Sequence, residues 1–179
     1  MQIIQSIIPN CYEIQPNIFS DNRGRFIKTF HRDLFLNHNL NVEWDEEYYS
    51  VSHKNVIRGM HFQLPPYNHE KLVYCATGAV FDVVIDLRKD SPTYKQFVVT
   101  KLNCDKGNML YIPKGCAHGF KSLQDKTIMM YKVSTVYHPE ADAGIAWDSC
   151  GINWSLEGEP IISPRDNLFI KLCDFESPF

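Results

Sequence analysis

The sequence predicts an all-β protein of the jelly-roll type, in which short antiparallel strands form a barrel or sandwich. Short segments of strand length recur along the 179 residues between turns rich in glycine and proline, and almost no segment has helical periodicity. The clearest strand covers 79–87, with period-2 alternation. Its two faces carry different sets of residues: Phe81, Val83, Ile85 and Leu87 on one, and Val80, Asp82, Val84 and Asp86 on the other.

The other predicted elements follow along the chain. One early helix is expected from about residue 33 to 38, with Asp33 as its N-cap. Further strands are expected at about 47–52, 71–76, 96–102, 108–112 and 127–135. Turns between them include Asp105-Lys106-Gly107 and Pro113-Lys114-Gly115. From about residue 151 we expect irregular structure, because three prolines would interrupt a long element there: Pro160, Pro164 and Pro178.

Length and composition indicate one globular domain, which we place at residues 1–179. The net charge of -3 gives no reason to expect nucleic acid or a membrane surface as a partner. The first residues lack the basic and apolar regions of a secretory signal, and no apolar run could span a membrane. We therefore expect a cytoplasmic protein, and in a chain of this size without a signal we expect the six cysteines, which include no CxxC pair, to be free thiols in or near the core.

Reactive side chains are concentrated in three parts of the sequence. The first part is 58–63 with the closely following 69–71, and the second is 112–120. The third consists of Tyr131, Tyr137 and the late segment 163–166. Each residue has a structural alternative when taken alone. A single histidine is more often structural than catalytic, a tyrosine often packs in the core, and an aspartate often caps a turn. The functional prediction therefore depends on their coincidence.

Histidines in a jelly roll raise the possibility of a metal site, which needs a cluster of imidazole and carboxylate ligands. The first reactive segment reads His61-Phe62-Gln63, so a glutamine stands where a second histidine ligand would be needed. Lys71 stands nearby and would repel a cation. We therefore expect neither a metal nor another cofactor.

Taken together, these segments resemble the dTDP-4-dehydrorhamnose 3,5-epimerase family, which are metal-free members of the cupin jelly rolls. The resemblance runs nearly from end to end. It is carried by the following segments: Phe19-Ser20-Asp21-Asn22-Arg23-Gly24, Asn55-Val56-Ile57-Arg58-Gly59-Met60-His61-Phe62-Gln63, Lys71-Leu72-Val73, Gly78-Ala79-Val80-Phe81-Asp82-Val83, Asp86-Leu87-Arg88-Lys89-Asp90-Ser91-Pro92-Thr93, Ile112-Pro113-Lys114-Gly115-Cys116-Ala117-His118-Gly119-Phe120, Tyr131-Lys132, Tyr137-His138-Pro139 and Ser163-Pro164-Arg165-Asp166.

The resemblance implies an enzyme that inverts carbons beside the keto group of a nucleotide-linked 4-keto-6-deoxy sugar. It implies His61 as the general base, Asp166 as the residue that orients it, Lys71 at the developing oxyanion and Tyr131 as the acid on the opposite face. It implies that a further set binds substrate: Arg23, Phe26, Arg58, Gln63, His118 and Tyr137. It also implies a homodimer that exchanges N-terminal strands, which would carry Arg23 and Phe26 to the partner's site.

These residue types suit the chemistry independently of the resemblance. A proton beside a ketone is weakly acidic because its loss gives an enolate. A neutral histidine can remove that proton near pH 7, and an aspartate can fix the tautomer of the base. A cation at the enolate oxygen and a tyrosine hydroxyl on the other face would complete the inversion.

Three positions near the predicted site depart from the family pattern, and they leave the nucleobase open. They are Lys28, Glu46 and Tyr48, and a thymidine, cytidine or guanosine diphosphate sugar remains compatible with them. The choice among inversion at C3, at C5 or at both also stays open. Two functions other than epimerisation are compatible with the fold: a sugar-nucleotide ketoisomerase and a non-catalytic sugar-binding module. The first typically has two histidines close together on one strand, and the second would not need the complete set of four catalytic residues.

Overall fold

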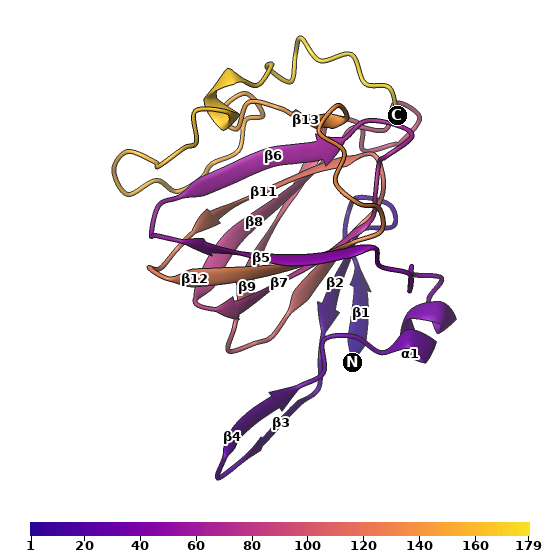
Figure 1. Ribbon diagram of the computed structural model, residues 1–179, viewed down its shortest axis with the longest axis vertical. Helices are drawn as coiled ribbons and strands as arrows, with labels where there is room; N and C mark the ends of the chain where they lie inside the picture. Colours follow the sequence, from indigo (N-terminus) through magenta and orange to yellow (C-terminus); the bar gives the residue numbers. More distant parts are fainter.

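The computed structural model describes residues 1–179 as two antiparallel sheets packed face to face (Figure 1). The six-stranded sheet has the order β1-β2-β10-β7-β12-β5, and the five-stranded sheet has the order β13-β6-β11-β8-β9. Strands β3 and β4 form a separate hairpin that extends away from the sandwich (Figure 1). The predicted jelly-roll class is confirmed by this arrangement.

The elements have the following bounds: β1 Gln2–Gln5, β2 Tyr12–Gln15, β3 Ile18–Asp21, β4 Gly24–Ile27, α1 Arg32–Asn37, β5 Glu46–Ser52, β6 Ile57–Gln63, β7 Lys71–Thr77, β8 Ala79–Asp86, β9 Phe97–Asn103, β10 Met109–Ile112, β11 Cys116–Ser122, β12 Thr127–Val133, β13 Asp142–Gly144 and the 3-10 helix η1 Asp166–Leu168. None of the helices is long and apolar enough to cross a membrane.

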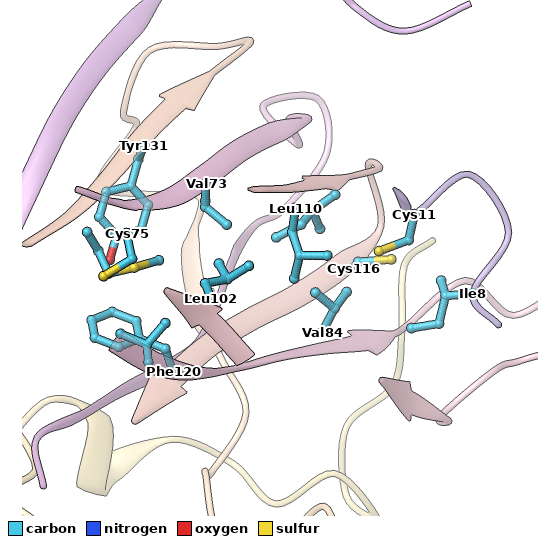
Figure 2. Close-up of a cluster of buried hydrophobic side chains, with 13 residues drawn as sticks. Ile8, Cys11, Val73, Cys75, Val84, Leu102, Leu110, Cys116, Phe120 and Tyr131 are labelled. Carbon is cyan, nitrogen blue, oxygen red and sulfur yellow. The ribbon is translucent and has the colours of Figure 1, made fainter. Parts of the chain in front are cut away.

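Strand β8 illustrates how the sequence pattern positions the core, because both of its faces are buried. Val80 and Val84 belong to the apolar cluster between the two sheets, which Figure 2 shows with Tyr131 at one end and Cys11 and Cys116 at the other. Val83 and Ile85 point to the opposite face, where the C-terminal segment covers the five-stranded sheet with Trp154, Leu172 and other side chains. The irregular segment after residue 151 is therefore part of the core.

The predicted strands agree with the structure to within one or two residues, but the prediction of Asp33 as N-cap is wrong. His31 occupies the N-cap of α1 without a side-chain hydrogen bond, and Asp33 lies in the first turn. An acidic side chain there still interacts favourably with the positive end of the helix. Seven strands were not predicted as strands: β1, β2, β3, β4, β6, β11 and β13.

The cysteines are free, as predicted for a chain of this size without a secretory signal. Cys11, Cys75, Cys116 and Cys150 are buried and Cys104 is half-buried. The expectation of a location in or near the core does not hold for Cys173, which is exposed.

A close backbone approach between β6 and β11 fixes where the reactive side chains lie. Gly59 has a φ of +140°, and a Cβ added there would lie 2.5 Å from Cα of Gly119. Both strands therefore need glycine at this contact, one residue away from Arg58 and two from His61.

We predict that Gly59→Ala destabilises the protein by about 2–4 kcal/mol, because backbone strain and a backbone clash add together. Gly158→Ala is the matched control, since its φ is also positive, at +89°, but no atom lies within 4 Å of the added Cβ. Its cost should be limited to about 1–2 kcal/mol. Denaturant unfolding measures both, and equal losses would show that the contact with β11 is readily relieved.

Candidate functional site

A cavity of about 510 Å³ lies between the two sheets and is lined by residues from β5, β6, β7, β11 and β12. It brings together most of the predicted site residues, which are Glu46, Tyr48, Arg58, His61, Gln63, Lys71, His118, Tyr131 and Tyr137. Asp166 lies behind His61 and lines an adjoining groove of about 570 Å³. These ten residues thus come from both sheets, from the segment around Tyr137 and from the C-terminal segment.

His61 on β6 and Asp166 at the start of η1 form the central pair. The Nε2 atom of His61 lies 2.9 Å from Oδ1 of Asp166, which leaves Nδ1 as the ring nitrogen without a protein partner. The other carboxylate oxygen accepts the backbone N–H of Gly59 at 3.0 Å. Because Asp166 is only 3% exposed, these contacts hold the imidazole in one orientation.

The surroundings keep this pair in the protonation states that suit a general base. Burial lowers the pKa of His61, and this effect outweighs the opposing effect of the hydrogen bond that the ring donates to Asp166. For Asp166, burial acts to raise the pKa, but the hydrogen bonds from His61, Gly59 and Ser163 prevail and lower it to about 2. At neutral pH the pair is therefore an imidazole beside a carboxylate.

Lys71 at the start of β7 is a buried cation on the cavity wall. Its side chain donates from Nζ to the backbone carbonyl of His61 at 3.2 Å. Burial lowers its pKa to about 8, although Asp142 and Asp82 act in the opposite direction. The side chain is therefore mostly charged at pH 7 and held next to the base.

Tyr131 on β12 closes another wall of the cavity. Its hydroxyl lies 3.2 Å from Oγ of Ser50, and its ring stacks on that of Tyr48 with centroids 4.9 Å apart and an angle of 18°. Burial raises the pKa of Tyr131 above the ordinary value for a phenol. The hydroxyl therefore stays protonated at neutral pH and is available as a proton donor.

His118 on β11 belongs to a second, fully buried histidine–aspartate pair. Its Nε2 atom lies 3.0 and 2.9 Å from the two carboxylate oxygens of Asp82. The ring of His118 lies edge-on to Tyr131, with centroids 6.2 Å apart. Sequence reasoning missed Asp82 as a site residue, and the only signal was an acidic residue on a face of the 79–87 strand that is otherwise largely apolar.

The rim of the cavity is tied together by polar contacts from Tyr137. Its backbone N–H donates to Oε1 of Glu46 at 3.0 Å, and its hydroxyl donates to Oδ2 of Asp142 at 3.2 Å. Arg165 forms a salt bridge with the same aspartate. Asp142 and Arg165 line the cavity but were not predicted as site residues. Their proximity depends on the pairing of β13 with β6 and on the position of η1.

Gln63 faces the cavity, but its amide is engaged with the backbone. The amide nitrogen donates to the carbonyl of Tyr67 at 2.9 Å, and the amide oxygen accepts the N–H of His138 at 2.6 Å. Arg58 is held by Oγ of Ser52 at 3.1 Å and reaches both the cavity and the adjoining groove. Of these two predicted binding residues, Arg58 is therefore the one with unused donors.

Three predicted residues lie outside both the cavity and the adjoining groove of this chain. Arg23 and Phe26 are on the β3–β4 hairpin, where they line a separate hollow of about 450 Å³. Arg23 pairs with Asp21 of the same hairpin at 2.6 Å, and its side chain is 86% exposed. Lys28 follows β4 directly and is exposed. The structure contains no group of three or more His, Cys, Asp or Glu side chains that could hold a metal ion.

Comparison with known proteins relates this geometry to one family. The family described as dTDP-4-dehydrorhamnose 3,5-epimerase matches residues 5–174. The enzyme of that name from Escherichia coli K12 is 39% identical over 176 residues, which cover 96% of this chain and 95% of that protein. The enzyme from Methanothermobacter thermautotrophicus is 38% identical over 169 residues, which cover 92% of this chain and 91% of that protein.

Solved structures give the same relationship. The Bacillus anthracis dTDP-4-dehydrorhamnose 3,5-epimerase, crystallised with TDP and PPi, has a TM-score of 0.92 and 34% identity, covering 96% of this chain and 99% of its own. The Legionella pneumophila enzyme in complex with dTDP-4-keto-L-rhamnose has a TM-score of 0.93 and 32% identity, covering 98% of this chain and 94% of its own. The chain therefore belongs to the dTDP-4-dehydrorhamnose 3,5-epimerase family of carbohydrate isomerases.

Proposed function

We propose that this protein inverts C3 and C5 of dTDP-4-keto-6-deoxyglucose through enolate intermediates. The observation that carries the proposal is the convergence of His61, Lys71 and Tyr131 on one cavity, with Asp166 bonded to His61 from behind. The E. coli relative is named for this reaction, and the L. pneumophila relative was crystallised with a keto sugar linked to dTDP.

His61 removes the proton from the carbon beside the keto group, using the Nδ1 lone pair that Asp166 leaves free. Asp166 holds the tautomer and stabilises the imidazolium that forms. Lys71 lies at the sugar O4, where negative charge develops in the enolate. A preorganised donor at such an oxygen contributes about 3–4 kcal/mol to the lowering of the barrier.

Tyr131 returns a proton to the opposite face of the same carbon and so completes the inversion. Its protonated state and its place on the other sheet from His61 support this role. Arg58 and the neighbouring groove suit the diphosphate, since a guanidinium can bind phosphate oxygens bidentately. We assign contacts with the sugar or the nucleotide to four residues: Tyr137, His118, Glu46 and Tyr48. We assign a structural role in the cavity wall to Gln63.

We propose a homodimer, because the β3–β4 hairpin leaves its sandwich and exposes aromatic side chains. Phe19 and Phe26 are paired across the hairpin and are 62% and 63% exposed. Seated on a second copy of this chain, the hairpin would supply Arg23 and Phe26 to the partner's cavity and bring Lys28 close to its mouth. The free cysteines are compatible with a reducing compartment, and we propose the cytoplasm.

A second candidate function is inversion at one carbon only. A 3'-monoepimerase from Streptomyces bikiniensis, crystallised with dTDP-quinovose, has a TM-score of 0.90 and 27% identity to this chain. Glu46 and Tyr48 lie on the cavity wall, where they can alter how the sugar or base is oriented. We propose that catalysis in either case needs no metal, because Asp166 is already paired with His61 and Asp142 with Arg165.

We predict that dTDP-4-keto-6-deoxyglucose, incubated with the protein in D2O and EDTA, acquires deuterium at both C3 and C5 with inversion. His61→Asn should abolish both exchange and inversion. Tyr131→Phe should retain exchange on the original face while inversion falls about 10²–10⁴-fold, the range for a positioned acid. Proton NMR and mass spectrometry of the product measure each outcome.

Tyr137→Phe is the control for the acid, since it removes the phenol of the rival tyrosine in the cavity and preserves the ring. Normal inversion by Tyr131→Phe together with loss in Tyr137→Phe would move the acid to Tyr137. Deuterium at one carbon only would establish the monoepimerase. Loss of turnover in EDTA that one metal restores would refute the metal-free mechanism.

We predict a bell-shaped dependence of kcat/KM on pH. The rate should fall with decreasing pH through a value below 6.5, because protonated His61 cannot accept the substrate proton. It should fall again with increasing pH near 8, where Lys71 loses its charge. Lys71→Arg should remove the alkaline limb even where the overall rate is lower, since a guanidinium stays charged there. An unchanged alkaline limb in this variant would assign it to another group.

A further inference from the structure

Each inversion leaves the protein in a different protonation state, and this poses a problem that the four catalytic groups do not solve. On the proposed function, His61 gains the proton that leaves the sugar, and Tyr131 loses the proton that arrives on the other face. The protein then holds an imidazolium and a phenolate. Both must return to neutral before the same pair can invert a second carbon or a second substrate molecule.

The phenol of Tyr131 has limited access to a new proton. The residue is 8% exposed, and the stacked ring of Tyr48 covers one of its faces. The hydroxyl has one hydrogen-bond partner in the protein, which is Oγ of Ser50 at 3.2 Å. The other two catalytic groups on the cavity are directed elsewhere. His61 lies on the other sheet, and Nζ of Lys71 donates to the backbone carbonyl of His61.

Strand register places Ser50 next to this phenol. On the β5–β12 pair, Tyr131 stands opposite Tyr48 and Met129 stands opposite Ser50, so Ser50 and Tyr131 are diagonal neighbours on one face. Ser50 is half-buried and lines the cavity, and β5 is the edge strand of its sheet (Figure 1). A serine hydroxyl both donates and accepts, which a relay requires.

We propose that Ser50 is a positioning and relay residue that returns a proton to Tyr131 after each inversion. The Ser50 hydroxyl gives its proton to the phenolate oxygen and takes one from a water molecule in the cavity. The hydroxide so formed is neutralised by the proton that leaves the His61 imidazolium. One O–H bond breaks and one forms at Ser50 and at the water molecule, one O–H bond forms at Tyr131 and one N–H bond breaks at His61, so the step balances without another reactant.

His118 is the rival relay, and its geometry is less suitable. Its ring centroid is 6.2 Å from that of Tyr131, and its Nε2 atom is occupied by Asp82. The hydroxyl of Tyr131 forms no hydrogen bond with His118, whereas Ser50 is in contact with it. Proton return through Ser50 therefore needs no rearrangement of the protein.

The test compares the first inversion with continuous turnover in Ser50→Ala. With enzyme in excess over dTDP-4-keto-6-deoxyglucose, the first inversion should proceed within about threefold of the wild-type rate, because Tyr131 starts protonated. Steady-state inversion should fall by about tenfold or more, with a burst of one inverted carbon per site and accumulation of singly inverted sugar. Ser50→Thr keeps the hydroxyl and should restore both rates.

Tyr49→Phe is the matched control, since it removes a hydroxyl from the adjacent, exposed position of the same strand. It should behave as the wild type. If Ser50→Ala slows the first inversion as much as steady-state turnover, Ser50 only orients the phenol and the relay is refuted. If neither rate changes, the proton returns by another route. Absence of exchange and inversion in the wild-type protein would instead refute the proposed function.

Discussion

The site depends above all on the hydrogen bond between His61 and Asp166, which joins two parts of the chain 105 residues apart. The bond can form only because the C-terminal segment passes over β6 (Figure 1). Trp154, Leu172 and Phe175 of this segment pack in the apolar cluster on that face of the five-stranded sheet. Gly59 contributes in two ways. Its N–H donates to Asp166, and its lack of a side chain allows β11 to approach β6 closely. The packing of the irregular C-terminal segment thus stabilises one orientation of the His61 imidazole.

Much of the fold could be predicted from local pattern, and the omissions have physical causes. Strand β8 was clear because alternation was uninterrupted and its polar residues were few. Strands β6 and β11 were missed as strands because both contain glycine and carry charged or imidazole side chains into the cavity. The β3–β4 hairpin was missed because nearly all its residues are exposed, so that no buried face imposes alternation.

The candidate site shows a similar division. His61, Lys71, Tyr131 and Asp166 were identified through the order of motifs along the chain, and they meet at one cavity and its adjoining groove. Ser50 and Asp82 gain significance only through contacts across neighbouring strands, which no spacing in the sequence reveals. Arg23 and Phe26 lie outside the cavity of their own chain, so their predicted contribution requires a second copy.

The central claim is that one proton is removed from a sugar carbon on one face and another is delivered to the same carbon on the opposite face. A crystal structure with a bound dTDP-6-deoxyhexose that lacks the keto group, and so cannot form an enolate, tests this most directly. We expect the sugar ring between Nδ1 of His61 and the hydroxyl of Tyr131, with its O4 near Nζ of Lys71. A sugar that presents the same face to both residues, or that lies outside this cavity, would contradict the account.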